Sequence, residues 1–232
     1  MGSTIWTVGH STRPLDAFLE LLAHHRLEAV ADVRRFPGSR RYPQYAEAAL
    51  SATLTEHDIA YRWLPALGGR RRPLPDSPNV AWLNASFRGY ADHIGSAVFS
   101  QGLDELLELS GRLRTTLMCA EAVWWRCHRA LIADVLCVRG IEVVHILDAK
   151  HTVVHPYTSA ARIVQGRLSY VPVDDEGNRA SHRTPFIVDS LLRTAGQSWL
   201  CVLFVGDTDE MRGETEKSPT GAIRARYGNG IA

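Results

Sequence analysis

The 232-residue chain alternates two hydrophobic patterns over its first two thirds. Short runs rich in apolar and β-branched residues predict β-strands, and segments with apolar residues every three to four positions predict helices. The predicted strands cover residues 4–8, 27–33, 60–64, 115–118 and 141–147, and the predicted helices cover residues 15–23, 44–57, 99–113 and 126–139. This alternation is typical of an α/β protein, here a Rossmann-like three-layer sandwich with a mainly parallel sheet.

Two parts of the chain depart from this pattern. Residues 65–85 contain four prolines and predict an irregular connection. Beyond the last predicted strand the alternation fades, although residues 168–173 could add an edge strand and residues 198–205 have the composition of a strand. We therefore predict a Rossmann-like domain over residues 1–173 and a C-terminal extension over residues 174–232 that is irregular and partly disordered.

The overall composition excludes several classes of protein. Apolar residues make up 45% of the chain, which argues against collagen-like, mucin-like and wholly disordered proteins. The formal net charge of +1 argues against a protein that coats nucleic acid through bulk electrostatics. No apolar run approaches the roughly 20 residues that span a bilayer, so we expect no membrane association. Four cysteines and no secretory signal predict a reduced, cytoplasmic protein.

Three of the predicted strands end in reactive side chains. The first strand is followed by Gly9-His10-Ser11, the second by Asp32-Val33-Arg34-Arg35, and the fourth by Cys119-Ala120-Glu121. Ligands of parallel α/β sheets bind beyond the carboxyl ends of the strands, where such loops meet. The sequence therefore predicts one site, in which Asp32 orients a ligand or a site arginine and His10 lies near the cysteine loop.

The densest set of reactive groups is Cys119, Glu121, Cys127, His128 and Arg129, and it permits three interpretations. A cysteine before a helix can be a nucleophile, because helix amides and nearby arginines favour its thiolate. Glu121 can be a general acid or base. Cys119, Cys127 and His128 can hold a metal, with His10 or Glu121 as a fourth ligand, and this set favours zinc. Because Cys127 and His128 are adjacent, we expect only one of them to face the site, which weakens the metal interpretation. Both cysteines could also be buried packing residues.

Arginines are concentrated in one part of the chain. Residues 34–72 contain eight arginines against three acidic residues, and seven of the eight lie in two loops. Arginine suits bidentate phosphate contact, and neighbouring aromatic rings can stack on bases. The residues predicted to bind substrate or phosphate are Arg34, Arg35, Arg40, Arg41, Arg70, Arg71, Arg129, Ser11 and Trp125. No dinucleotide fingerprint or Walker lysine supports NAD or ATP-driven chemistry.

Six short motifs resemble a known family. They are Thr7-Val-Gly-His-Ser11, Asp32-Val-Arg-Arg-Phe-Pro-Gly-Ser-Arg40, Leu67-Gly-Gly-Arg-Arg71, Phe87-Arg-Gly-Tyr-Ala91, Cys119-Ala-Glu121 and Cys127-His-Arg129. Together they resemble the family called domain of unknown function 488, over about residues 4–172. The resemblance implies a Rossmann-like fold with a Cys/Glu…Cys-His-Arg signature, and the family's reputation is that of a nucleotide- or nucleic-acid-processing domain. Residues 122–126 depart from the family pattern, since they contain two tryptophans where a proline is expected.

The leading expectation is a hydrolase or transferase that acts on a nucleotide or a nucleic-acid base, for example at a glycosidic bond in DNA repair. Glu121 would be its acid, base or nucleophile, and the other predicted catalytic residues are Cys119, His128, His10 and Asp32. One alternative is a thiol-transfer, sulfur-transfer or phosphatase-like enzyme centred on Cys119. Another is a non-catalytic module that binds nucleotide or nucleic acid through the arginine-rich loops. We predict no cofactor apart from the zinc that the metal interpretation requires.

Overall fold

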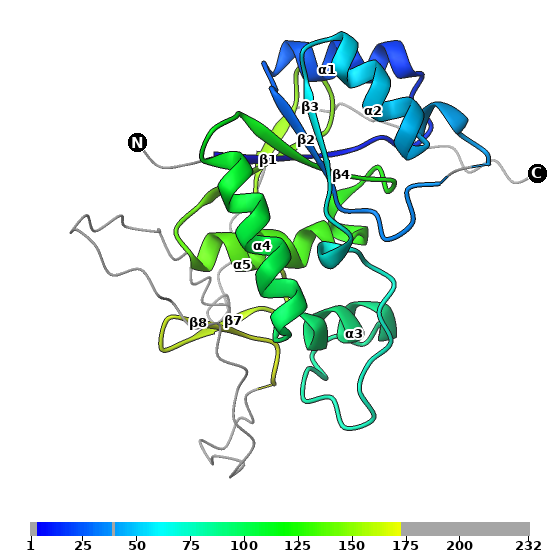
Figure 1. Cartoon of the computed structure of the whole chain (residues 1–232). Helices are drawn as coiled ribbons and strands as arrows, with labels where there is room; N and C mark the ends of the chain where they lie inside the picture. Colours follow the sequence, from blue (N-terminus) through cyan, green and yellow to red (C-terminus); the bar gives the residue numbers. More distant parts are fainter. Residues whose placement is uncertain (1–3, 39, 173–232) are drawn as a thin grey trace, which may run out of the picture. The chain divides into compact units, whose positions relative to one another are not determined.

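The computed structural model describes residues 4–38 and 40–172, which form an α/β sandwich around a mostly parallel six-stranded sheet (Figure 1). The strand order is β3-β2-β4-β1-β5-β6, and all neighbours are parallel except β5 and β6. The strands are β1 (Thr4–Gly9), β2 (Ala29–Asp32), β3 (Ala60–Trp63), β4 (Thr115–Cys119), β5 (Glu142–Ile146) and β6 (Thr152–Val154). The predicted α/β sandwich is confirmed.

Helices cover both faces of the sheet, so there are two cores. One core packs α1 (Leu15–His24) and α2 (Glu47–Glu56) against side chains such as Val8, Val30 and Met118. The other packs α3 (Ala85–Ile94), α4 (Ala97–Ser110) and α5 (Arg129–Val138) against the opposite side chains of the same strands. Figure 1 shows α1 and α2 together on one side and α4 and α5 on the other. The central strands are buried on both faces, which explains their nearly continuous apolar runs.

Several elements differ from those predicted. The proline-rich connection is followed by α3, whose first turn is capped by the Asn84 side chain, 2.9 Å from the backbone nitrogen of Ser86. Gly89 inside this helix weakens the helical pattern in the sequence. A glycine is nevertheless required at this position, because a Cβ there would lie 2.5 Å from the carbonyl carbon of Arg72. The last helix, α5, begins at Arg129 rather than at residue 126.

The predicted edge strand at 168–173 is wrong, because this region forms a separate two-stranded hairpin. The hairpin consists of β7 (Arg162–Val164) and β8 (Arg167–Ser169), and β6 provides the sheet edge instead. The strand predicted at 198–205 and the extension predicted over 174–232 lie outside the described residues, so these expectations and the boundary after residue 173 stay predictions. None of the helices within residues 4–38 and 40–172 is long and apolar enough to cross a bilayer.

The carboxyl ends of β1, β2 and β4 are held together by backbone contacts that continue past the strands. The His10 amide donates to the Cys119 carbonyl at 3.0 Å, and the Val33 amide donates to the Met118 carbonyl at 3.0 Å. Gly9 allows the closest approach, because a Cβ there would lie 1.9 Å from the backbone oxygen of Glu121. The loops after the three strands therefore share one fixed edge of the sheet, as the sequence predicts.

The contact at Gly9 leads to a stability prediction. Gly9→Ala should lower the free energy of unfolding by about 1–3 kcal/mol, because the new methyl group must push the loop after β4 away. Gly38→Ala is the matched control, since a Cβ at Gly38 meets nothing within 4 Å. Urea unfolding of the two variants measures the difference. Equal stabilities would contradict the close approach.

Candidate active site: a buried cysteine cluster

Cys119, Cys127 and His128 form a cluster where β4 ends and α5 begins. Their two sulfur atoms and one imidazole nitrogen all lie within 4.8 Å of one another, an arrangement that could hold a metal ion. Cys119 is 6% exposed and Cys127 is 2% exposed. Both Cys127 and His128 face the cluster, with Cys127 Sγ 3.6 Å from His128 Nδ1. The expectation that only one of the two faces the site is wrong, because the backbone is extended at Cys127 and helical at His128.

The His128 ring is held in one orientation. Its Nε2 lies 3.0 Å from the Val33 carbonyl oxygen, which can only accept, so Nε2 carries a proton and Nδ1 is directed toward the sulfurs. Gly69 packs against the same ring, and a Cβ there would lie 2.7 Å from Nδ1. The Tyr90 ring lies on another side, with its centroid 5.0 Å from that of His128.

Arg129 is a buried cation beside this cluster. Its side chain is 1% exposed. Its Nε donates to Cys127 Sγ at 3.4 Å and its Nη1 donates to Thr7 Oγ1 at 3.2 Å, while Nη2 donates to the backbone oxygen of Glu121. A buried cation is costly unless an anion neutralises it. Among these partners only Cys127 can ionise, so charge balance indicates that Cys127 is a thiolate.

The pKa values of the two thiols move in opposite directions. Burial alone would raise the pKa of Cys127, but the hydrogen bond with Cys119, together with His128 and Arg129, lowers it well below the ordinary range. The same hydrogen bond, with burial, raises the pKa of Cys119. Between these two pKa values the pair holds one proton, which Cys119 donates to Cys127. The sequence-based interpretation centred the nucleophile on Cys119, whereas the structure favours the thiolate at Cys127.

A chain of buried polar groups connects Arg129 to Asp134. Thr7 Oγ1 lies 2.7 Å from His145 Nδ1, His145 Nε2 lies 2.9 Å from His155 Nδ1, and His155 Nε2 lies 3.0 Å from Asp134 Oδ1. Because a carboxylate can only accept, His155 Nε2 donates to Asp134, and the neutral ring of His145 donates through one nitrogen and accepts through the other. Burial lowers the pKa of His145 to about 2, which keeps this ring neutral. We call this chain of groups the relay.

Asp134 anchors the far end of the relay. It is fully buried and also accepts hydrogen bonds from the Thr158 amide at 2.9 Å, the Thr158 hydroxyl at 2.6 Å and the Tyr170 hydroxyl at 2.8 Å. Trp124 covers the relay, because its ring stacks on His145 with centroids 4.3 Å apart and planes at 5°. The tryptophan that departs from the expected family pattern thus has a packing role in this chain.

Asp32 and Arg34 form a second buried group on the other side of β4. Asp32 Oδ1 lies 2.9 Å from Arg34 Nε, and Asp32 Oδ2 accepts from Arg34 Nη2 and from the Tyr61 hydroxyl. Both side chains are buried, and Arg34 Nη1 donates to the Tyr45 carbonyl at 2.8 Å. Arg34 is therefore oriented by Asp32 and by backbone, while the catalytic role of Asp32 and the phosphate contact of Arg34 stay predictions.

His10 lies beside the Asp32–Arg34 pair. Its ring stacks on Tyr45 with centroids 4.0 Å apart, and its Nε2 lies 3.5 Å from Arg34 Nη1. Burial and the positive charge of Arg34 lower the pKa of His10 to about 4, so the ring is neutral near pH 7. Ser11, which follows it, is half-buried with a φ of 50°.

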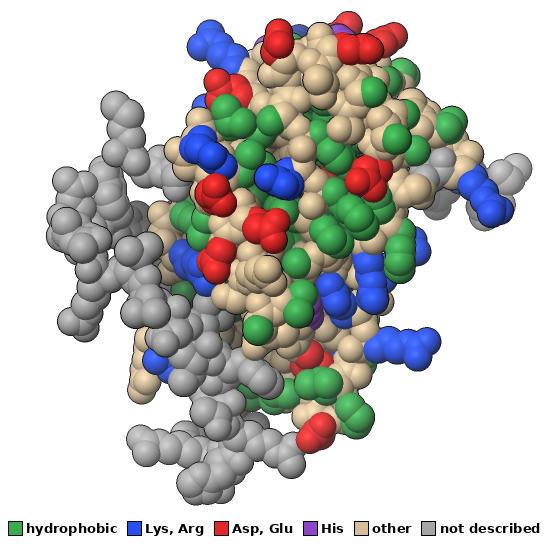
Figure 2. All heavy atoms as spheres, in the orientation of Figure 1, with side chains coloured by type: hydrophobic (Ala, Val, Ile, Leu, Met, Phe, Trp, Pro, Cys, Tyr) green, Lys and Arg blue, Asp and Glu red, His purple; other side chains and the backbone are tan. Residues whose placement is uncertain are grey.

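The predicted arginine loops lie in two different places. Arg35, Arg70 and Arg71 line a cavity beside α3, and Arg72 joins them. Figure 2 shows Lys and Arg side chains gathered where this loop meets α3. Arg40 and Arg41 are exposed and do not line this cavity.

A family model now identifies the chain. The model, described as Domain of unknown function DUF488, matches residues 14–136. The protein belongs to the DUF488 family. No curated protein and no solved structure matches the chain significantly. The matched region of this DUF488 protein includes Cys119, Cys127 and Asp134, but it ends before His145 and His155.

The structure brings together only some of the residues predicted for the DUF488 site. Cys119, Cys127, His128 and Arg129 meet directly. Glu121 contributes its backbone oxygen to Arg129, while its side chain is exposed and forms no hydrogen bond or ion pair within the described part of the chain. Trp125 is 53% exposed. The relay was missed by the sequence analysis, although Thr7 and His145 are polar residues inside apolar strands, which is a signal of buried polar function.

Proposed function

We propose that this DUF488 protein is an enzyme, a hydrolase or transferase, that acts on a nucleotide or nucleic acid through a thiolate at Cys127. One observation carries the proposal: the buried Arg129 guanidinium donates to Cys127 Sγ, and none of its other hydrogen-bond partners can carry a negative charge. A thiolate held by a cation and a neighbouring thiol is the state required for nucleophilic attack.

The proposed reaction uses both sulfurs. Cys127 Sγ forms a bond to the electrophilic atom of the substrate, the bond to the leaving group breaks, and the leaving group takes the proton of the Cys119 thiol. Water, or another acceptor in a transfer reaction, then attacks the covalent intermediate. Its proton returns to Cys119, and the Cys127 thiolate is restored. The proton that departs with the leaving group is thus replaced by one from water or from the acceptor, and the pair returns to its starting state.

Detection of the thiolate tests the proposal. The ultraviolet absorbance of a thiolate should persist in the purified protein at about pH 6, well below the ordinary thiol pKa of about 8.5. It should disappear in Cys127→Ser and remain in Cys137→Ser, a control in the last turn of α5 outside the cluster. Absorbance that appears only above about pH 8.5 would refute the thiolate.

Turnover tests the reaction itself. We expect hydrolysis or transfer within a panel of nucleosides, nucleotides and damaged-base DNA, and loss of that turnover in Cys127→Ser. Glu121→Gln in the same assay tests the predicted acid–base role of Glu121 at a glycosidic bond. If Glu121→Gln lost turnover while Cys127→Ser kept full activity, the result would favour the acid–base role of Glu121 and contradict the proposed Cys127 nucleophile. Binding without any turnover would favour the non-catalytic module. The cytoplasmic location stays a prediction.

A zinc centre is a second candidate, supported by the convergence of three ligand atoms within 4.8 Å. The hydrogen bond between His128 Nε2 and the Val33 carbonyl is also the kind of contact that orients a metal-binding imidazole. Three protein ligands would leave a fourth position open, as in catalytic zinc sites. Stoichiometric zinc in the purified protein, lost in Cys119→Ser, would establish this centre in place of the free thiolate.

A further inference from the structure

A cavity of ligand size lies between the Arg70–Arg72 loop and α3, beside the cysteine cluster. Its volume is about 590 Å³, within the range of roughly 300–1,000 Å³ typical of small-molecule sites. Four arginines line it, Arg35, Arg70, Arg71 and Arg72, together with Asp92, His93 and Ser96 and several uncharged residues. Among the described residues that line the cavity, His93 alone has an aromatic ring.

The four arginines form no ion pair within the described part of the chain, and they outnumber the acidic residues among the described lining residues, so the cavity has a net positive charge. Asp92, the one acidic residue of the lining, is already occupied: it accepts from the Leu74 amide at 2.8 Å, the Ser77 hydroxyl at 2.6 Å and the Asn79 amide group at 2.7 Å. Burial and the positive charge of Arg35 lower the pKa of Arg71. The lowered pKa reflects in part repulsion between the positive charges of Arg35 and Arg71, and a bound anion would reduce this repulsion.

Two of the arginine side chains that line the cavity are held in place by hydrogen bonds to the backbone. Arg71 Nε donates to the Gly68 carbonyl at 3.0 Å, and Arg35 Nη1 donates to the Arg70 carbonyl at 2.9 Å. The chain that carries Arg35 packs directly on Gly68, where a Cβ would lie 2.8 Å from the Arg35 Cα. These contacts hold two of the guanidinium groups in place, and the side chains of Arg70 and Arg72 have no hydrogen-bond partner among the described residues.

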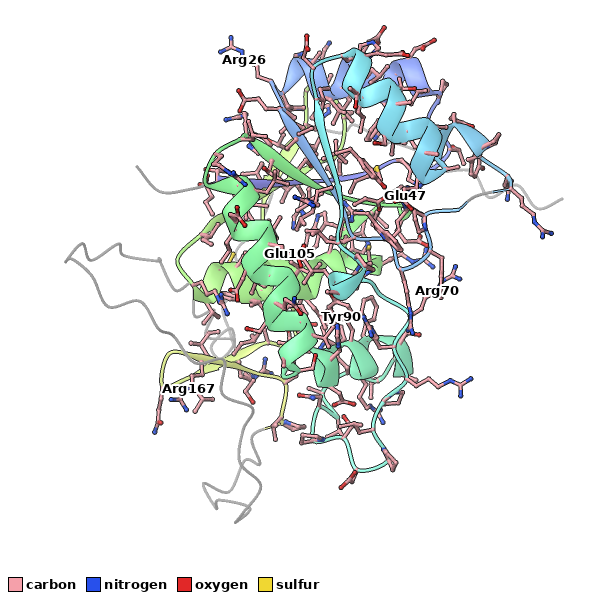
Figure 3. All side chains as sticks on the ribbon, in the orientation of Figure 1. Arg26, Glu47, Arg70, Tyr90, Glu105 and Arg167 are labelled. Atoms are coloured by element: carbon pink, nitrogen blue, oxygen red, sulfur yellow. The ribbon has the colours of Figure 1, made fainter. Side chains whose placement is uncertain are left out.

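Tyr90 connects this cavity to the cysteine cluster. Its ring centroid lies 5.9 Å from that of His93, which lines the cavity, and 5.0 Å from that of His128, which belongs to the cluster. Figure 3 shows Arg70 and Tyr90 in the same region of the molecule, with Arg26 at the opposite end. Tyr90 is therefore in ring contact with one residue of the cavity and with one residue of the cluster.

We propose that this cavity binds the oligophosphate chain of a small molecule, such as a nucleoside diphosphate or triphosphate, and recognises it by its phosphates rather than its base. Four guanidinium groups suit two or three phosphates, since each phosphate is commonly held by one or two arginines. The near absence of aromatic rings from the lining leaves little for a base to stack on. The use of this ligand as a substrate rests on the function proposed above, whereas its binding does not.

Calorimetric titration of the full chain tests the binding. Inorganic tripolyphosphate, ATP and GTP should bind with affinities within about threefold of one another. A single-stranded oligonucleotide and inorganic phosphate should bind at least tenfold more weakly. Preference for the oligonucleotide would overturn the proposal in favour of a nucleic-acid surface. Strong preference for one base would overturn the claim of phosphate recognition.

Two paired variants localise the site. Arg70→Ala combined with Arg72→Ala should weaken tripolyphosphate binding at least tenfold, because both exposed side chains are free to contact phosphate. Arg26→Ala combined with Arg62→Ala removes the same charge from exposed positions outside the cavity and should change the affinity less than threefold. Equal losses in the two pairs would refute the cavity as the site. Cys127→Ser should keep full binding, so failure of the thiolate chemistry and failure of this site are distinguishable.

Discussion

Arg129→Met should both destabilise the protein and abolish the Cys127 thiolate. The substitution keeps an apolar side chain in the core but removes the guanidinium, which donates to Cys127 Sγ, to Thr7 and to the Glu121 carbonyl. Breaking a buried charge pair by removing one partner costs about 3–5 kcal/mol. We therefore expect the free energy of unfolding to fall by about that amount, and the pKa of Cys127 to rise toward the ordinary thiol value.

Urea unfolding and thiolate absorbance measure these two effects separately. Arg126→Met is the matched control, because Arg126 is exposed in the short helix just before Cys127 and its replacement should change stability by less than about 0.5 kcal/mol. An Arg129 variant as stable as this control, with its thiolate intact, would show that the two residues do not form the charge pair.

Asp134→Ala should be comparably destabilising, because it leaves the far end of the relay without an acceptor. His155, the Thr158 amide, the Thr158 hydroxyl and the Tyr170 hydroxyl would all lose their partner. Each buried group left unsatisfied costs about 1–3 kcal/mol, and partial rearrangement limits the total to about 3–5 kcal/mol.

The conservative variant Asp134→Asn separates charge from shape. Its single carbonyl oxygen can replace only part of the carboxylate, so we expect a loss of about 1–3 kcal/mol in urea unfolding. Asp104→Ala, at an exposed position of α4, is the control and should be nearly neutral. If Asp134→Ala also left the free energy of unfolding nearly unchanged, other groups would have to accept the hydrogen bonds that Asp134 accepts in the relay.

The sheet and most of its helices could be predicted from the sequence, because buried parallel strands and amphipathic helices have distinct periods. The helix α3 could not, since prolines precede it and Gly89 interrupts it for a packing reason that involves Arg72. The hairpin of β7 and β8 could not be predicted either. Strands of three residues are too short for their hydrophobic pattern to show whether they join the main sheet or form a separate hairpin.

The candidate site was predictable only where sequence position fixes geometry. The rule that parallel strands end at one edge predicted that the loops after β1, β2 and β4 would meet, and backbone hydrogen bonds join them. The pairing of Asp32 with Arg34 could also have been read from the sequence, because opposite charges two residues apart can pair in the loop where a strand ends. The relay could not, since its members come from β1, α5, β5 and the chain after β6, and only tertiary packing selects their partners.

The position of β1 has a consequence for the order in which the molecule assembles. In the sheet β1 lies between β4 and β5. Both of these neighbours are synthesised more than a hundred residues after β1. Such non-local pairing slows folding, because the entropy of closing a long loop is lost before the stabilising contacts between the strands form. Thr7 reaches Arg129 only when that closure is complete. The thiols of a nascent chain are therefore unprotected until late in folding, and oxidants or alkylating agents should modify Cys127 faster during refolding than in the native protein.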